Sequence, residues 1–156
     1  MLEFSLPLNT NFTRPIISLY SAKVLIDSGA ELPILDTSEE VVKKLFQGKL
    51  LSEDCTIKGV GGSHIAKVYR LHKFAVGKMV YRDIPVLLAD INDVNVDMIL
   101  GSAMFGAGIK YTIDTKSNTV SFCIPDEAAM SGKLYKRTSF GWGVLDFING
   151  NWVVEG

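Results

Sequence analysis

The stretch VLIDSGAELPIL, residues 24–35, places an acidic residue, a small hydroxyl residue and a glycine between two apolar runs. An ionised carboxylate is costly to bury unless it is paired or protonated. Asp27 therefore lies either at an exposed turn or in a site that manages its charge. Asp-Ser-Gly is common in turns, where Asp and Ser bond to nearby backbone and Gly adopts positive φ. The tripeptide alone favours a plain turn, and the rest of the sequence is needed to distinguish such a turn from a functional site.

Length and composition predict one globular domain. The chain has 156 residues, of which 47% are hydrophobic and 21% charged, with a formal net charge of -1. This balance gives no bias toward nucleic acid or an anionic membrane. Cys55 and Cys123 form neither a CxxC pair nor a disulfide framework, which favours a reducing compartment. No segment resembles a signal peptide or a membrane span, so we expect a soluble, cytoplasmic protein.

Short strands with turn residues between them dominate the pattern. Runs rich in Val, Ile, Tyr and Phe predict strands at 15–20, 23–27, 32–36, 65–76, 79–90, 109–114 and 119–124. One helix is predicted at about 38–47, and a second short one within 102–108. Hairpins are predicted around a turn at 115–118 and, with Asn149-Gly150 as its turn, in 141–156. The fold class is therefore mainly β.

Three features follow one another in a fixed order along the chain. An apolar strand leads directly into Asp27-Ser28-Gly29-Ala30. Some thirty residues later, KGVGGSHI (58–65) forms a glycine-rich tip between two stretches that can pair as a long hairpin. The apolar segment DMILGSAMF (97–105) then ends a strand at Gly101 and continues in small residues.

With these motifs the chain resembles the retropepsin-like aspartic proteases, the retroviral-type family, over about residues 15–124. The strand pair at 109–114 and 119–124 is similar to that of bacterial members. The resemblance implies a retropepsin-like closed β-barrel (the acid protease fold) with one or two short helices and a flap hairpin. It also implies that the late apolar strand packs behind the catalytic turn. The protease domain would span 1–124, and 125–156 would be a C-terminal extension, a hairpin packed on the same domain or at a dimer interface.

The chemistry of this class needs two carboxylates held close together that share one proton. One acts as general base on water and the other as general acid, so neither a metal nor an organic cofactor is required. The sequence offers one such turn, because Asp114-Thr115 is followed by Lys116 and lacks the glycine. We interpret Asp114 as a hairpin-turn residue. The second acid would come from a second copy of Asp27, which predicts a C2 homodimer.

The resemblance assigns roles to the residues of the turn. Asp27 would be the catalytic acid and base, and Ser28 would hydrogen-bond across the dimer axis. Gly29 would give the turn its backbone freedom and leave its carbonyl open to substrate. Ala30 would lie beside the substrate, and Glu31 would contact the substrate backbone at a position where the family often has aspartate.

The resemblance also assigns residues to the flap and to apolar pockets. At the flap tip Val60 would offer its backbone N–H, and Gly59, Gly61 and Gly62 would let the hairpin hinge. The pockets would be lined by Leu25, Ile57, Val60 and Ile99. The predicted partners are therefore a second copy of the chain and a peptide or protein substrate, with no nucleic acid and no membrane.

Three functions remain open at the level of the sequence. The first is an aspartic endopeptidase that cleaves between hydrophobic residues. The second is a catalytically weak or inactive dimerisation or peptide-binding module on the same fold, for which Ser28, Glu31 and Ser63-His64 leave room. The third is an unrelated β-barrel binding protein in which Asp27 caps a turn. No metal site is predicted, because neither histidine has partners at ligand spacing and DINDVNVD (90–97) lacks a calcium loop's glycine.

Overall fold

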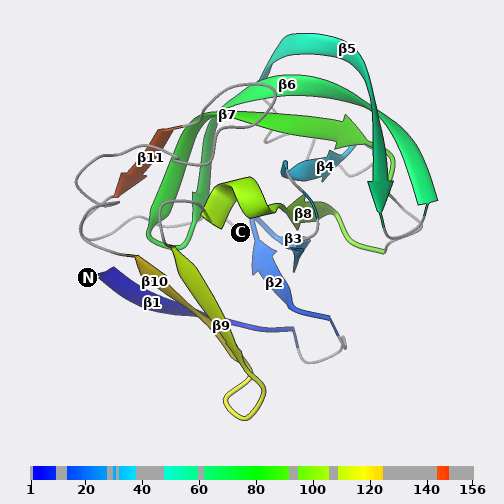
Figure 1. Cartoon of the computed structure of the whole chain (residues 1–156). Helices are drawn as coiled ribbons and strands as arrows, with labels where there is room; N and C mark the ends of the chain where they lie inside the picture. The colour runs from blue at the N-terminus through cyan, green and yellow to red at the C-terminus, as the bar shows by residue number, and fades with distance from the viewer. Residues whose placement is uncertain are drawn as a thin grey trace.

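A computed structural model describes residues 2–9, 14–27, 30, 32–37, 48–59, 62–91, 95–105, 109–124 and 144–147. The described chain is mainly β, as predicted (Figure 1). Its elements are β1 (Leu2–Pro7), β2 (Ile16–Leu19), β3 (Ala22–Ile26), β4 (Ile34–Asp36), β5 (Gly48–Gly59), β6 (Gly62–Val76), β7 (Met79–Ala89), β8 (Met98–Leu100), the 3-10 helix η2 (Ser102–Phe105), β9 (Lys110–Asp114), β10 (Thr119–Ile124) and β11 (Val144–Phe147). Within these ranges no helix is long and apolar enough to cross a membrane.

The larger sheet has the strand order β2-β3-β8-β4-β7-β6-β5, and β11 pairs with β7 beside this path. Strand β8 lies between β3 and β4, parallel to β3 and antiparallel to β4. The segment that joins β3 to β4 therefore has to pass the end of β8. The path of described strands runs from β2 to β5 without closing on itself. The closed barrel thus stays a prediction.

The central strands are buried on both faces. Val24 and Ile26 of β3 and Leu100 of β8 belong to a large core on one face, whereas Leu25 and Ile99 belong to a small core on the other. Successive strand residues point to opposite faces, so a strand covered on both sides has to be apolar throughout. This explains the uninterrupted runs VLI and MIL in the sequence.

A three-stranded antiparallel sheet, β1-β10-β9, covers the large core. Strand β1 pairs with β10 in continuous register from Leu2↔Ile124 to Pro7↔Thr119. The rings of Phe4 and Phe122 stack with their centroids 5.1 Å apart. Strand β1 is not among the strands predicted above, although its alternation of Glu3 and Ser5 with apolar residues is a strand pattern.

One left-handed residue in β7 changes which side chains face the large core. Tyr81 and Ile84 are both buried in that core, although residues three apart in a regular strand point to opposite faces. Asp83 lies between them with a φ of 54°. The guanidinium of Arg70 donates a hydrogen bond to the carbonyl of Asp83. Because of the irregularity at Asp83, side chains that come before and after this residue in β7 point into the same large core.

Several predicted elements are confirmed, and some lie outside the described residues. The strands predicted between 15 and 36 and between 65 and 124 are present, and the second short helix is η2. The helix predicted at 38–47 and the turn at Asn149-Gly150 fall outside the described ranges. From the predicted C-terminal hairpin the structure describes β11, which pairs with β7 in register Val144↔Arg82 to Phe147↔Met79.

The turn between β9 and β10 confirms the interpretation of Asp114. Its Oδ1 accepts hydrogen bonds from the backbone N–H of Lys116 (2.9 Å) and of Ser117 (3.2 Å). Asn118 adopts a φ of 56°, and its Nδ2 donates to the carbonyl of Leu8 (3.0 Å). This turn projects away from the larger sheet (Figure 1). Asp114 therefore holds a hairpin together.

We expect the Asp114 carboxylate to make stability depend on acid pH. The N–H groups of Ser117 and Lys116 lower the pKa of Asp114 in the folded state. A lowered pKa contributes stability above the unfolded-state value, and this contribution disappears as the pH falls through the folded-state value. Unfolding measured from about pH 5 to about pH 2.5 should show wild type losing more stability than Asp114→Asn. Parallel pH curves for the two proteins would contradict this role.

Candidate active site

The residue that carries the predicted chemistry, Asp27, lies directly after β3 at the start of a tight turn. Its backbone N–H donates to the carbonyl of Leu100 at the end of β8 (3.0 Å). Its carbonyl accepts the N–H of Ala30 (3.2 Å), which closes a four-residue turn. Ser28 and Gly29, between them, lie outside the described residues. The Asp27 side chain is partly exposed, as a residue that meets a substrate has to be.

The other end of the turn is held by η2. The N–H of Ser102 donates to the carbonyl of Ala30 (2.7 Å), and the N–H of Met104 donates to that of Gly101 (3.1 Å). Both ends of the turn are thus hydrogen-bonded to one short segment, Leu100–Ser102. The expectation that the late apolar strand packs behind the turn is confirmed. Sequence order alone places these segments some seventy residues apart, and the parallel pairing of β3 with β8 brings them together.

An apolar layer lies beside the turn. Leu25 and Ile99 are partners in the parallel register of β3 and β8, and both are buried in the small core. Ala30 packs against the same core. Ala66 and Val68 of β6 also belong to it, so the β5–β6 hairpin shares a core with the strand that leads into Asp27. Two predicted pocket residues and one predicted substrate-binding residue are therefore neighbours.

The glycine-rich segment forms the end of the predicted long hairpin. Strands β5 and β6 pair in the register Ile57↔His64, Lys58↔Ser63 and Gly59↔Gly62. Irregularities interrupt the register in the first half of β5. In Figure 1 the two strands form a long curved ribbon at the edge of the larger sheet, with their paired ends to the right. The structure thus places Gly59 and Gly62 opposite each other next to the connection.

The structure accounts for only part of the predicted site. It brings together Asp27, Ala30, Leu25 and Ile99, and it places Ile57, Gly59 and Gly62 on the hairpin. Ser28, Gly29, Glu31, Val60 and Gly61 lie outside the described residues, so their assigned roles stay predictions.

Sequence reasoning missed a group of hydrogen bonds at the start of β8, the end of that strand away from Asp27. The carboxylate of Asp97 accepts the N–H of Lys23 (2.7 Å), while the N–H of Asp97 donates to the carbonyl of Lys23 (2.9 Å). The carbonyl of Asp97 accepts the N–H of Asp36 (2.9 Å). Asp97 thereby fixes the start of β8 between β3 and β4. Its position in an acidic loop gave no signal for this, because the partners are distant in sequence.

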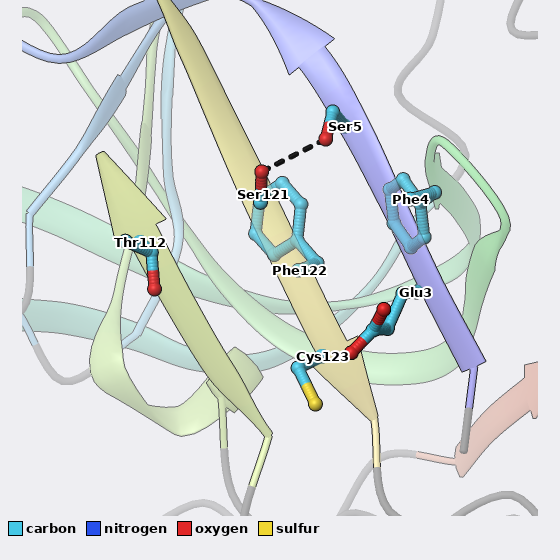
Figure 2. Close-up of a pocket in the computed structure, with 7 residues that line it drawn as sticks. All are labelled: Glu3, Phe4, Ser5, Thr112, Ser121, Phe122 and Cys123. Atoms are coloured by element: carbon cyan, nitrogen blue, oxygen red, sulfur yellow. Dashed lines mark hydrogen bonds between the residues drawn. The ribbon is translucent and has the colours of Figure 1, made fainter. Parts of the chain in front are cut away.

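A second feature, an open depression, lies on the outer face of the three-stranded sheet (Figure 2). The hydroxyls of Ser5 and Ser121 are hydrogen-bonded across β1 and β10 at 2.8 Å. Glu3 stands opposite Cys123 in register. The described residues that line the depression are Glu3, Phe4, Ser5, Thr112, Ser121, Phe122 and Cys123. Among these described residues there is a single carboxylate, that of Glu3, and not the acid pair that the predicted chemistry needs.

Comparison with known proteins identifies the family. A family model described as aspartyl protease matches residues 19–104, more than half of the chain. The matched span contains the Asp27 turn, the β5–β6 hairpin, β8 and the first three residues of η2. The chain therefore belongs to the aspartyl protease family. No curated protein matches it.

Proposed function

We propose that this chain is an aspartic endopeptidase whose active site is completed by a second copy of Asp27 in a C2 homodimer. The observation that carries the proposal is the turn 27–30, which presents one partly exposed aspartate and is hydrogen-bonded at both ends. A backbone that is held at both ends by hydrogen bonds can keep its carboxylate at a fixed, short distance from another carboxylate. The family match over this turn agrees with the proposal.

A single copy of the turn supplies one of the two carboxylates that the proposed reaction needs. Two aspartates on a common axis would share one proton, because like charges that near cannot both ionise. The ionised aspartate would take a proton from water, and the other would donate a proton to the scissile carbonyl. The oxygen of water would attack the carbonyl carbon as these protons move. The aspartate that received the proton from water would then donate it to the nitrogen of the tetrahedral intermediate, and the other would take a proton back from a hydroxyl of the intermediate. Cleavage of the C–N bond would release the amine and leave a carboxyl group. In this proposal Ser28 would link the two turns, and Gly29 would present its carbonyl to the substrate.

The apolar layer supports a preference for hydrophobic residues on both sides of the cleaved bond. The buried Leu25 and Ile99 and the partly buried Ala30 form a non-polar layer beside the turn, and burial of apolar side chains drives recognition of hydrophobic residues. Ile57 and Val60 would extend this layer from the hairpin. Glu31 would add a polar contact to the substrate backbone.

The β5–β6 hairpin is proposed as the flap. Ala66 anchors β6 on the small core, and β6 continues for four residues to Gly62. At about 3.3 Å per residue the tip would extend about 13 Å beyond this anchor. Val60 and its neighbours Gly59, Gly61 and Gly62 would close over a bound peptide. We place the protease domain in residues 1–124 and the extension in 125–156, and the pairing of β11 with β7 supports packing of the extension on the same domain.

The proposal is tested by cleavage of a denatured protein mixture from about pH 4 to about pH 7, under mildly acidic to neutral conditions. Mass spectrometry of the products should find cuts between hydrophobic residues that a pepstatin-type inhibitor prevents, and sedimentation should find a dimer. A well-formed dimer that binds peptide and leaves it intact would identify a binding module instead. A monomer that does not respond to the inhibitor would contradict the shared site.

A further inference from the structure

We infer that Tyr81 is a positioning residue for the catalytic turn, and that its hydroxyl holds Asp27 in place through η2. This inference rests on the proposed function, since it concerns the geometry of the same site. Tyr81 lies on β7, and so it belongs neither to the turn 27–30, nor to the β5–β6 hairpin, nor to β8. In the proposed mechanism it does not touch the substrate.

The hydroxyl of Tyr81 makes a directed contact with η2. Tyr81 is fully buried, and its Oη donates to the carbonyl of Met104 at 2.5 Å. Burial raises the pKa of Tyr81, so the phenol stays protonated and remains a donor. The sulfur of Met79 lies 3.5 Å from the same oxygen. Tyr81 is also paired with Phe74 on one side and Leu145 on the other, so its backbone is held by two strands.

Hydrogen bonds on the main chain connect this contact to Asp27. The N–H of Met104 is bonded to Gly101, the N–H of Ser102 to Ala30, and the N–H of Ala30 to Asp27. These hydrogen bonds are joined by the peptide bond between Gly101 and Ser102 and by the backbone of Met104 and Ala30. A displacement of Met104 would therefore be passed to the Ala30 end of the turn, while the N–H of Asp27 stays bonded to Leu100 of β8.

The hydroxyl acts where η2 is weakest. A 3-10 helix of four residues has few internal hydrogen bonds, and its last carbonyls need partners outside the helix. The carbonyl of Met104 is one of these, and it is buried with its side chain in the large core. Tyr81 supplies the donor. Without it, this carbonyl has to find another donor, which favours a shift of η2 against the packing of the buried Met104 side chain.

Such a shift would alter catalysis more than substrate binding. The pKa values of a carboxylate pair depend on the separation of the two groups, so a displaced turn changes the apparent values for the pair. Misplacement by about 1 Å can lower a rate by about 10²-fold. The apolar layer formed by Leu25 and Ile99 is fixed by the β3–β8 register and does not depend on Met104. We expect a loss in kcat with little change in KM.

The test compares Tyr81→Phe with the matched control Tyr20→Phe. The hydroxyl of Tyr20 also binds a backbone group, the N–H of Ala75 at 2.9 Å, and its ring contacts Phe74. Each variant removes one hydroxyl from a hydrogen bond to the main chain, but the Tyr20 contact leads to β6 and not to the turn. The measurements are kcat, KM, the pH profile of kcat, and amide hydrogen exchange at Ala30 and Ser102.

For Tyr81→Phe we expect kcat to fall by about 10-fold or more with KM within about 2-fold, since the loss is one of positioning. The limbs of its pH profile should move, and exchange at Ala30 and Ser102 should accelerate. Tyr20→Phe should keep the wild-type kcat, pH profile and exchange at these amides. An unchanged pH profile and kcat in Tyr81→Phe, or the same losses in both variants, would overturn the inference.

Hydrogen exchange separates this inference from the proposed function. A wild-type protein without cleavage would contradict the endopeptidase proposal and leave the exchange measurement to decide the role of Tyr81. Unchanged hydrogen exchange at Ala30 and Ser102 in Tyr81→Phe would then refute the positioning role of Tyr81 without any measurement of activity.

Discussion

Asparagine in place of Asp27 should lower kcat by about 10²- to 10⁴-fold, the contribution that a general acid or base typically makes. The side chains are nearly equal in size, and the backbone hydrogen bonds of residue 27 to Leu100 and Ala30 do not use the carboxylate. The turn should therefore form in the variant. Asparagine cannot share a proton, so in the proposed dimer the pair would lose both its base and its acid. The measurement is the rate of cleavage of a peptide with hydrophobic residues on both sides of the cut bond.

Two controls make the Asp27→Asn result specific. The variant Asp114→Asn changes another aspartate, one held in the β9–β10 turn, and should retain wild-type kcat near neutral pH. Mixing equal amounts of wild-type and Asp27→Asn subunits, with time to exchange, should reduce wild-type activity to about half, because mixed dimers contain one carboxylate. Full activity in Asp27→Asn would contradict the assignment of the catalytic residue. Unreduced activity in the mixture would contradict the shared site.

The variant Gly77→Ala should be the most damaging single-methyl change to stability in the described part of the fold. Gly77 forms the turn between β6 and β7 with a φ of +57°, a conformation that costs other residues about 1–2 kcal/mol. An added Cβ would lie 2.3 Å from Cε2 of Phe4, where no atom fits. Overpacking typically costs about 1–3 kcal/mol more. The expected total of about 2–5 kcal/mol is a large share of the stability of a single domain.

Denaturant unfolding of three further proteins would check the cause. Lys78→Ala changes the neighbouring turn residue, which is exposed, and should alter stability by no more than about 0.5 kcal/mol. Phe4→Leu shortens the side chain that Gly77 contacts. The double variant should then be more stable than the sum of the two single losses, with the cost of the positive φ remaining. Simple additivity would show that the Phe4 ring does not cause the clash.

The parts of the site that could be predicted from the sequence are those that consist of a few consecutive residues. The turn at Asp27, the hairpin around Gly59 and Gly62, and the strand before Gly101 each occupy a few consecutive residues whose chemistry restricts the backbone. The contacts that hold them together are not local. Lys23 and Asp97 are 74 residues apart, and Tyr81 and Met104 are 23 apart. A tyrosine in an apolar strand gives no sign of which carbonyl its hydroxyl will meet.

Strand β1 is the clearest miss for the same reason. Its inward side chains pack on a strand that begins more than a hundred residues later, and Ser5 and Ser121 are 116 residues apart. A short alternating segment can be a strand only if a partner exists, and local pattern does not identify that partner. The large core, which β1 and β10 cover, is thus specified by long-range pairing more than by local propensity.

The pairing of β1 with β10 also bears on when the protein is active. The N-terminal strand has its partner within its own subunit, and the sheet that it forms covers the large core of that subunit. We therefore expect that a single chain can fold before it meets a second copy. If catalysis needs two subunits, association becomes a separate, second-order step with its own dissociation constant. The concentration of the protein would then control its activity. Separate subunits would be folded and inactive, and proteolysis would begin only where the local concentration approaches the dissociation constant.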